Sequence, residues 1–571
     1  MRCIYSKCVS PVQFRVRSWL SRVIRQEDGG MIIFGLFIFI LILAVCGIAV
    51  DVMRYEQARV RLQGSLDRAV LAAADLDQTQ SPDAVVRDYL TMTGLLGTLD
   101  GAPTVQQGIN FRSVNATAWA PVNTYFMRLL GVDELVAPAS STAEERISNV
   151  EISLVLDISS SMLSDRRFDN LKPAARTFVD TVLANNSTSS TAGLVSVSMI
   201  PYSAVVNPGP AITNQMNLSA THTYSACPLF PDSSFTTTGL DLSRLYARVG
   251  HFDYGASTNT NATPITRPWC YPGTLNQIVV HSTSNTALHN AINSLAPFGN
   301  TAIDLGAKWG VALLDTSTRT MVRNIVGNSS PVAGRPLNIT TDDVLKVLVL
   351  MTDGENTTEY DLASRFKTDL STVWVWKQSA TQAWGSVPQN RISIRISDNN
   401  TPNNFTDDRF FWLGQSSNSV RNYPQGFPAY VNLTGEAYQP GRGIDHTNVV
   451  RHLSWQDVFA TWVRTRIYSY LFAEPYQRGQ ISYATYIETY YALDSVVESD
   501  AADRRLDAIC NAAKAAGVIV YTVSFEASFH GQETLASCAS SPSHYFDVSG
   551  TAIATAFSAI ATDIRQLKLI Q

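Results

Sequence analysis

The strongest constraint on this chain is an uncharged apolar run at residues 31–50, MIIFGLFIFILILAVCGIAV. As an α-helix, such a run spans about 30 Å, which is the thickness of the hydrocarbon core of a bilayer. Six basic residues precede it within residues 1–30, against two acidic residues, Glu27 and Asp28. The positive-inside rule therefore predicts a cytoplasmic basic tail at 1–30, a transmembrane helix at 31–50 and the remaining chain outside the cytoplasm.

Two other interpretations of the run are a cleaved signal peptide and a buried core helix. The run is longer than the apolar region of a usual signal peptide, and the following AVDVMRYE has no small-x-small cleavage site. Its length and lack of charge also argue against a core helix. We expect an uncleaved anchor with a single span.

The helix is expected to continue beyond the membrane as an amphipathic stalk at residues 51–77. Arginines lie between apolar residues that recur at helical spacing. These apolar positions are Tyr55, Ala58, Leu62, Leu66, Ala69 and Ala73. This stripe could pack against similar helices of other proteins or on the soluble part of the same chain, and the sequence leaves both open. A small connecting module is expected at 78–149.

Composition limits the functional classes. The chain has 571 residues, with 45% hydrophobic and 16% charged residues and a net charge of −5. This length suits about two to four domains. No basic cluster follows residue 30, so the chain lacks the charge pattern of a nucleic-acid-binding protein.

The large C-terminal part, residues 150–571, is predicted to be an α/β domain. ISLVL at 152–156 and LKVLVLM at 345–351 are short apolar runs typical of buried parallel strands. Helical patterns alternate with such runs, which predicts a doubly wound parallel sheet. Segments at about 202–276 and 357–500 lack this alternation and are interpreted as two large insertions.

Oxygen-bearing side chains follow both predicted strands and one loop between them. They are Asp157, Ser159 and Ser161 in VLDISSSM, Thr301 in FGNTAIDLG, and Asp353 in LVLMTDGEN. Ligands bind at the carboxyl ends of strands in open α/β sheets. Oxygen-only ligands suit a hard divalent cation, so we predict a site for Mg²⁺, with Mn²⁺ or Ca²⁺ as alternatives. The alternative is a purely structural role, in which these residues only cap a helix and form a turn.

This D-x-S-x-S, T, D pattern resembles the metal-ion-dependent adhesion site (MIDAS) of von Willebrand factor A (vWA) domains. The resemblance implies a Rossmann-like fold and a bound cation with one open coordination position, which a carboxylate of a protein partner could fill. The sequence departs from the pattern at Ser160, where family members often have Gly.

The segment RQEDGGMIIFGLFIFILILAVCGIAVDVMRYEQARVRLQGSLDRAVLAAA resembles the N-terminus of TadE/TadG-type proteins of Tad (tight adherence, Flp) pilus assembly. With a vWA domain, the whole chain resembles a TadG-like protein. This implies a bacterial inner-membrane protein with its bulk in the periplasm and pilus-assembly or pseudopilin-like partners. Gly30 is followed by MIIFG, without the Glu that pilins carry five residues after their cleavage point, which also favours an uncleaved anchor.

Four cysteines, Cys227, Cys270, Cys510 and Cys538, lie in the part predicted to be outside the cytoplasm, where disulfides form. Three connectivities are possible, and proximity in sequence favours Cys227–Cys270 and Cys510–Cys538.

We expect a binding protein, not an enzyme. The alternatives are a vWA-type surface or matrix adhesin and a metal-dependent hydrolase. For the hydrolase, Glu355 is the nearest candidate base and no His is recognisable beside the five ligands.

Overall fold

The structure is a computed structural model. It describes residues 28–75, 78, 80–107, 111–146, 149–186, 193–254, 264–340, 343–397, 408–417, 419–426, 444–445 and 449–570. Most of the predicted basic tail, residues 1–27, lies outside this description. The chain forms two compact units, Met1–Ile147 (unit 1) and Ser148–Gln571 (unit 2). The predicted combination of a long apolar N-terminal helix with a mixed α/β architecture is confirmed.

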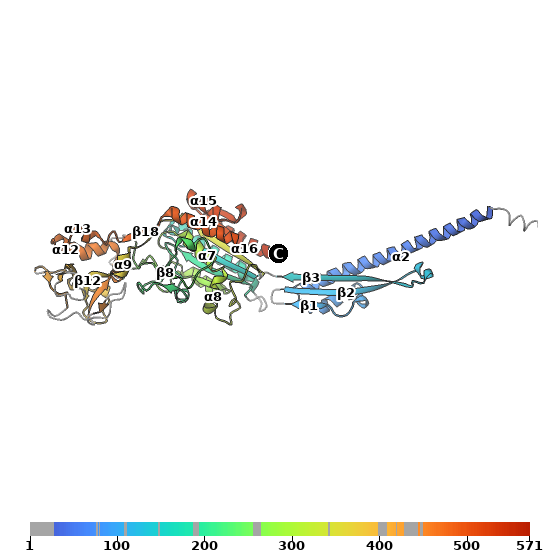
Figure 1. Cartoon of the computed structure of the whole chain (residues 1–571), viewed down its shortest axis with the longest axis horizontal. Coiled ribbons are helices and arrows are strands. Elements are labelled where there is room, and N and C mark those ends of the chain that lie inside the picture. The colour runs from blue at the N-terminus through green and yellow to red at the C-terminus, as the bar shows by residue number, and fades with distance from the viewer. Residues whose placement is uncertain are drawn as a thin grey trace, which may run out of the picture. The chain divides into compact units, whose positions relative to one another are not determined.

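Unit 1 is built on one long helix, α2 (Asp28–Ala74), beside a three-stranded antiparallel sheet (Figure 1). The other elements of the unit are α3 (Pro82–Met92), η1 (Leu96–Thr98), β1 (Thr104–Gln107), β2 (Phe111–Asn123), η2 (Met127–Leu130) and β3 (Glu134–Arg146). By length and composition, the stretch Gly30–Ala74 of α2 includes a segment apolar enough to cross a membrane. The predicted span and stalk are therefore one continuous helix, which ends at Ala74.

The apolar stripe of the stalk is covered by unit 1 itself. Leu62, Leu66 and Ala69 are buried in one cluster with alternate residues of β2, such as Val114 and Ala118. Alternation follows from the period of two along a strand. The sequence allowed the stripe to pack either against helices of other proteins or on its own chain. In the structure it packs on its own chain, so these buried side chains are not exposed to other helices.

The core of unit 2 is a six-stranded sheet in the order β20-β19-β10-β4-β5-β9. The strands are β4 (Asn149–Asp157), β5 (Val195–Tyr202), β9 (Val279–Ser282), β10 (Val344–Thr352), β19 (Ile519–Phe525) and β20 (Tyr545–Val548). Neighbouring strands from β20 to β5 are parallel, whereas β9 runs antiparallel to β5 at the edge. The sequence predicted no strand at 279–282, so this antiparallel edge strand is an addition to the predicted sheet.

Helices pack on both faces of this sheet. One face is covered mainly by α7 (Ile303–Ala312), α14 (Ser499–Ala515) and α15 (Phe529–Cys538). The other is covered by α4 (Arg167–Leu183), α6 (Asn285–Ser294) and α16 (Ala552–Ile570). Residues of β4 alternate between the two cores, with Val155 in the first and Leu154 and Leu156 in the second. Both faces of the central strands are therefore apolar, as the continuous runs in the sequence indicated.

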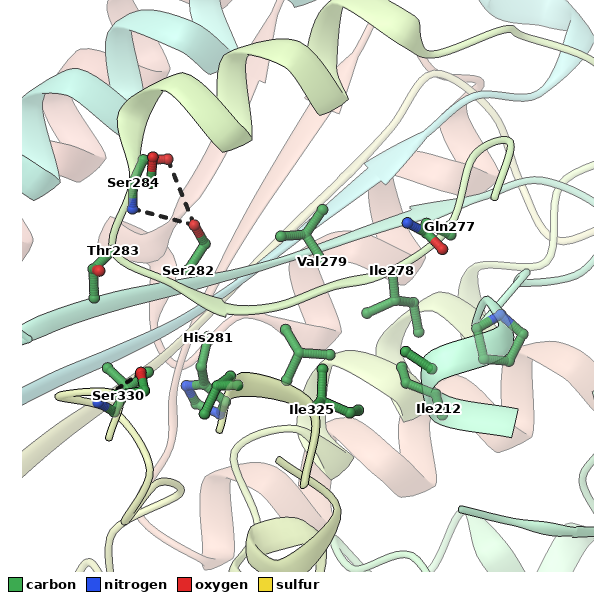
Figure 2. A pocket seen from close by; sticks show the side chains of 15 residues that line it. Ile212, Gln277, Ile278, Val279, His281, Ser282, Thr283, Ser284, Ile325 and Ser330 are labelled. Carbon is green, nitrogen blue, oxygen red and sulfur yellow. Dashed lines mark hydrogen bonds between the residues drawn. The ribbon is translucent and has the colours of Figure 1, made fainter. Parts of the chain in front are cut away.

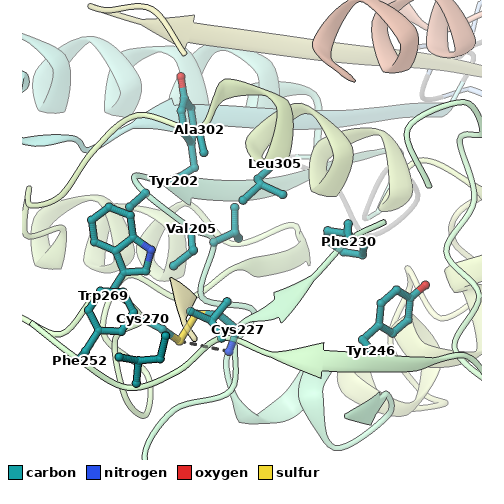
Figure 3. Packing of buried hydrophobic residues seen from close by; sticks show 14 of the residues in the cluster. Tyr202, Val205, Cys227, Phe230, Tyr246, Phe252, Trp269, Cys270, Ala302 and Leu305 are labelled. Atoms are coloured by element: carbon teal, nitrogen blue, oxygen red, sulfur yellow. Dashed lines mark hydrogen bonds between the residues drawn. A yellow bond between two sulfur atoms is a disulfide. The ribbon is translucent and has the colours of Figure 1, made fainter. Parts of the chain in front are cut away.

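The first segment predicted as an insertion, 202–276, contains short elements around a buried aromatic core. They are α5 (Pro210–Thr213), β6 (Asn217–Leu218), β7 (Pro228–Leu229) and β8 (Leu245–Arg248). Cys227 and Cys270 are disulfide-bonded within this core, among side chains that include Phe252 and Trp269 (Figure 3). A second disulfide joins Cys510 of α14 to Cys538 of α15.

The second such segment, 357–500, contains more regular structure than its sequence suggested. Strands β11 (Glu359–Leu362) and β18 (Leu493–Val497) pair with each other at its two ends. Between them lies an antiparallel sheet in the order β15-β14-β13-β12-β17-β16. Its strands are β12 (Leu370–Trp376), β13 (Ile392–Ser397), β14 (Arg409–Trp412), β15 (Val420–Arg421), β16 (Ile444–Asp445) and β17 (Val450–Ser454).

Helices complete this segment: α9 (Ser364–Thr368), α10 (Trp455–Thr461), α11 (Arg464–Arg466), α12 (Ala473–Gln477) and α13 (Tyr483–Ile487). Several tyrosines at 468–491 contact one another here, mostly edge to face or tilted, and Tyr476 stacks on Tyr486 with the ring centroids 4.8 Å apart. Some of them are exposed, including Tyr483 and Tyr491.

His281 on β9 is a buried polar side chain that is fully hydrogen-bonded. Its Nε2 donates to the carbonyl of Leu313 at 2.8 Å, and its Nδ1 lies 2.9 Å from the hydroxyl of Ser196. This arrangement suits the neutral imidazole protonated at Nε2, with the Ser196 hydroxyl donating to Nδ1. Burial, assisted by the nearby charges of Arg335 and Lys346, lowers the pKa of His281 to about 3. His281 therefore stays neutral in the folded state at pH values where it is protonated in the unfolded chain.

We predict that His281 makes the stability of unit 2 decline in mild acid. Between its ordinary pKa of 6.5 and about 3, the unfolded state binds one proton more than the folded state. The free energy of unfolding should then fall by up to about 1.4 kcal/mol per pH unit from this group alone as the pH decreases. In His281→Asn, urea titrations of the full chain between pH 6 and 4, followed by tryptophan fluorescence, should show a slope shallower by that amount.

The matched control is His530→Asn. His530 is exposed, and its pKa is raised by the hydrogen bond to Asp503, so it binds a proton in both states over this pH range. The control should keep the wild-type slope. Equal slopes for wild type and His281→Asn would contradict a neutral His281.

Candidate metal centre

The candidate centre forms where β4 and β10 end. These strands pair in parallel, with Leu156 opposite Met351. Asp157 and Asp353 therefore emerge from the same edge of the sheet, one residue out of register. Both side chains are buried.

Asp157 is held by two hydrogen bonds. Its Oδ1 accepts from the backbone N–H of Ser159 at 2.7 Å, and its Oδ2 accepts from the hydroxyl of Thr352 at 2.5 Å. The first bond closes a turn over the D-x-S step, a conformation that Asp side chains favour. The turn brings Ser159 back toward the strand end, where it is also buried.

A chain of hydrogen bonds joins the two hydroxyls to the second carboxylate. The hydroxyls of Ser159 and Ser161 lie 2.9 Å apart. Ser161 donates to Oδ1 of Asp353 at 2.7 Å. Four of the five predicted residues are therefore brought together.

The fifth predicted residue, Thr301, immediately precedes Ala302 and helix α7. A Cβ at Gly354 would lie only 3.6 Å from the Thr301 hydroxyl oxygen, which places that hydroxyl beside the Asp353–Gly354 turn. The Thr301 carbonyl accepts a hydrogen bond from the backbone N–H of Thr357 at 2.9 Å. All five predicted side chains thus gather at this edge of the sheet.

Ser160 ties two of these loops together. Its backbone N–H donates to the carbonyl of Gly299, and its hydroxyl accepts from the N–H of Gly299, both at 2.9 Å. The Ser160 side chain is therefore used to align the Thr301 loop with the D-x-S-x-S loop.

The two carboxylates disfavour each other's charge. Burial, together with the negative charge of Asp353, raises the pKa of Asp157 to about 7. A cation between the carboxylates would remove this penalty. The donor set of two carboxylates and three hydroxyls is all oxygen, so it fits a hard cation such as Mg²⁺. Within the described residues, no group of three or more His, Cys, Asp and Glu side chains offers a site of the zinc type.

Sequence reasoning missed Arg167, which lies at the start of α4. Its guanidinium donates to Oδ2 of Asp353 at 2.9 Å and to Oε2 of Glu526 at 2.8 Å. Arg167 thus supplies a positive charge on the side of Asp353 away from Ser161. No short sequence pattern could predict these two contacts, because Asp353 and Glu526 lie 186 and 359 residues away from Arg167.

The structure also places a histidine, His530, in the helix turn that packs beside the Asp353–Gly354 turn, which the sequence did not indicate. The first turn of α15 packs against the carbonyl of Gly354, since a Cβ at Gly531 would lie 2.3 Å from that oxygen. His530 in the same turn is exposed and lies 2.7 Å from a carboxylate oxygen of Asp503. Glu355, the base considered for a hydrolase, accepts a hydrogen bond from Ser528 at 2.8 Å.

A separate pocket of about 390 Å³ lies along β9 (Figure 2). Its lining includes Ile212, Ile278, Ile325 and His281. None of the five predicted ligand residues lines it. Both ring nitrogens of His281 are already hydrogen-bonded, so neither is free to bind a ligand in this pocket.

Several solved structures are similar to this chain. The vWF domain of the type V pili tip protein Mfa5 from Porphyromonas gingivalis matches at 14% identity with a TM-score of 0.29, over 74% of this chain and 97% of its own. The pilus adhesin SpaC from Lactobacillus rhamnosus GG matches at 12% identity and a TM-score of 0.27, over 81% of this chain and 34% of its own. The PilB minor pilin from Streptococcus sanguinis matches at 13% identity and a TM-score of 0.26, over 82% of this chain and 78% of its own.

In sequence, no curated protein matches the chain. A family model described as "Putative Flp pilus-assembly TadE/G-like" matches residues 29–76. These residues cover the predicted span and nearly all of the stalk, and the match confirms the resemblance inferred from the segment's sequence. Residues 29–76 are therefore a TadE/G-like segment of the Flp pilus-assembly type.

Proposed function

We propose that this protein is an inner-membrane-anchored component of Tad/Flp-type pilus assembly that binds protein partners through a cation at the candidate centre. The observation that supports binding most directly is the convergence of five oxygen-bearing side chains on the ends of β4 and β10. The TadE/G-like match over residues 29–76 supports the pilus-related role and the membrane anchor.

In this proposal, unit 2 is a Rossmann-like vWA-type domain interrupted by two insertions. Asp157, Ser159, Ser161, Thr301 and Asp353 hold Mg²⁺, or Mn²⁺ or Ca²⁺, directly or through water. An Asp or Glu of a partner completes the coordination from the open side. Arg167, which it shares with Glu526, offsets part of the negative charge of Asp353 and so lessens the repulsion of a partner's carboxylate.

The proposed topology has the N-terminus in the cytoplasm and both units in the periplasm. The charge distribution of residues 1–30 supports this orientation. The two disulfides of unit 2 also suit an oxidising compartment. The function is binding and assembly, without catalysis.

We predict that Asp157→Ala and Asp353→Ala each abolish Mg²⁺ binding, because each removes one of only two carboxylate ligands. Calorimetric titration of the full chain in detergent should show binding heat for wild type and none for either variant. Mg²⁺ should also raise the melting temperature of wild type and of the control below, but not of either variant, since a ligand stabilises the state that binds it. Asp169→Ala is the matched control, because Asp169 is an exposed carboxylate in the first turn of α4. Undiminished binding in both variants would refute the metal centre.

We predict that protease added to spheroplasts degrades both units and spares the first 30 residues. An epitope tag at the N-terminus should remain protected until the inner membrane is permeabilised, and a tag at the C-terminus should be lost at once. The reverse pattern of protection would overturn the proposed orientation.

We predict that a Ser161→Ala/Thr301→Ala allele reduces surface piliation and adherence severalfold at normal protein levels. These substitutions remove two neutral ligands and leave both carboxylates and Arg167 in place. The control allele is Thr181→Ala/Ser294→Ala, whose exposed hydroxyls bond only to carbonyls of their own helices. If the first allele supports full piliation, as the control should, partner binding does not depend on the cation.

A further inference from the structure

The tip of the β2–β3 hairpin in unit 1 is unusually apolar for an exposed loop. The tip is defined here as residues 124–133. Leu129 is 85% exposed and Leu130 is 66% exposed. Further exposed apolar side chains of the tip are Tyr125, Phe126 and Val132. Contiguous apolar exposure of this kind marks an interaction surface.

The tip is fastened to α2 at the first charged residue after the apolar run. The buried carboxylate of Asp51 accepts hydrogen bonds from the backbone N–H groups of Tyr125, Phe126 and Met127, at 2.8 to 2.9 Å. These N–H groups lie at the start of η2 and would otherwise lack partners, as in a helix N-cap.

Arg54, one turn further along α2, makes a second attachment. Its guanidinium donates to the carbonyl of Asn123 at 2.9 Å and lies 4.0 Å from the centre of the Tyr125 ring. Tyrosine and arginine side chains with one apolar and one polar part are typical of the membrane–water boundary.

The Phe126 side chain contacts α2 at Gly47, which lies within the apolar run. A Cβ at Gly47 would lie 2.4 Å from the Phe126 ring, so the ring lies directly on the helix at Gly47. Gly47 precedes Asp51 by four residues, which is about 6 Å along a helix. Figure 1 shows the N-terminal part of α2 continuing beyond the hairpin tip.

The conformation of the tip is held by its own hydrogen bonds. The backbone N–H of Thr124 donates to the carbonyl of Asp133 at 3.0 Å, and the Thr124 hydroxyl donates to the carbonyl of Val132. Gly131 ends η2 with a φ of 86°, a conformation that glycine adopts without strain. Leu129 and Leu130 are therefore presented on a fixed turn.

We propose that the hairpin tip inserts into the surface of the same bilayer that α2 spans, in the leaflet where the span ends at Asp51. This inference rests on the proposed membrane anchor. The occupant is lipid because the patch continues from the apolar run: Phe126 contacts Gly47 inside the run, and the polar attachments at Asp51 and Arg54 begin where the run ends. The exposed Arg128–Asp133 ion pair, 3.1 Å apart, suits the headgroup layer beside the apolar side chains.

The consequence is a second membrane contact for unit 1. A single helix leaves a domain free to rotate about the helix axis and to tilt. A turn inserted beside the helix, and bonded to it, fixes the orientation of the β1–β3 sheet relative to the membrane plane.

The test measures membrane depth at the tip in the full chain. Cys3, Cys8 and Cys46 are replaced by Ser, the disulfides are kept, and Leu129→Cys is labelled with the environment-sensitive fluorophore NBD. The matched control is Leu71→Cys, because Leu71 is also exposed and lies on the same helix, twenty residues or about 30 Å past Asp51. Both proteins are reconstituted in phosphatidylethanolamine–phosphatidylglycerol vesicles, oriented so that unit 1 faces outward.

For the tip label, we expect quenching by doxyl lipids at least about threefold stronger than for the control label, and quenching by aqueous iodide weaker by a similar factor. Asp51→Ala should reduce the lipid quenching of the tip label, because the tip loses its attachment to α2. Equal iodide quenching at both positions, with the protein still resistant to carbonate extraction, would overturn the inference while leaving the anchor intact.

Two other outcomes would also count against it. A tip label shielded from iodide and from doxyl lipid, with shielding lost as the protein is diluted in the vesicles, would mean that a second copy covers the tip. Release of the protein from vesicles by alkaline carbonate would overturn the membrane anchor and this inference together.

Discussion

The parallel pairing of β4 with β10 is the interaction on which unit 2 depends. Both strands are buried along almost their whole length and contribute side chains to the cores on both faces of the sheet. Their register leaves no freedom at the carboxyl ends, because a slip of one residue would exchange every side chain between the two cores. The positions of Asp157 and Asp353 are therefore set by the packing of the apolar residues that precede them.

Buried carboxylates have different partners at the two ends of this strand pair. At the amino end, Glu151 of β4 lies 3.4 Å from both Arg335 and Lys346 and accepts a hydrogen bond from the N–H of Leu337 at 2.7 Å. This carboxylate is surrounded by positive charge, as a buried ion requires. At the carboxyl end, the guanidinium of Arg167 pairs with Asp353 and with Glu526, whereas Asp157 accepts hydrogen bonds from the neutral N–H of Ser159 and hydroxyl of Thr352. The amino end therefore holds its carboxylate between two basic side chains, whereas at the carboxyl end burial and the charge of Asp353 raise the pKa of Asp157 to about 7.

In unit 1, one helix changes its surroundings along its length. Residues 31–50 are uncharged on all sides, as a lipid-facing helix is. The part after Tyr55 is amphipathic, and its buried stripe packs against α3, β2 and β3. Small side chains such as Ala69 and Ala73 on that stripe let the helix approach the sheet closely. Asp51 marks the change, and its carboxylate accepts hydrogen bonds from three backbone N–H groups of the hairpin.

The sequence by itself determined the features that depend on neighbouring residues. A membrane-length helix follows from twenty consecutive residues without charge. The strands at 152–156 and 345–351 follow from short apolar runs. The five oxygen-bearing residues could be chosen because each adjoins such an element, and the structure brings all five to one edge of the sheet.

Only the tertiary structure decided what depends on distant partners. It placed Arg167 on Asp353, turned β9 antiparallel to β5, and covered the stripe at Leu62 and Leu66 with the chain's own sheet. It also formed the antiparallel sheet between β11 and β18. An apolar stripe or an arginine presents the same local pattern whatever it contacts, and the partner is selected by long-range packing that no short window of sequence contains.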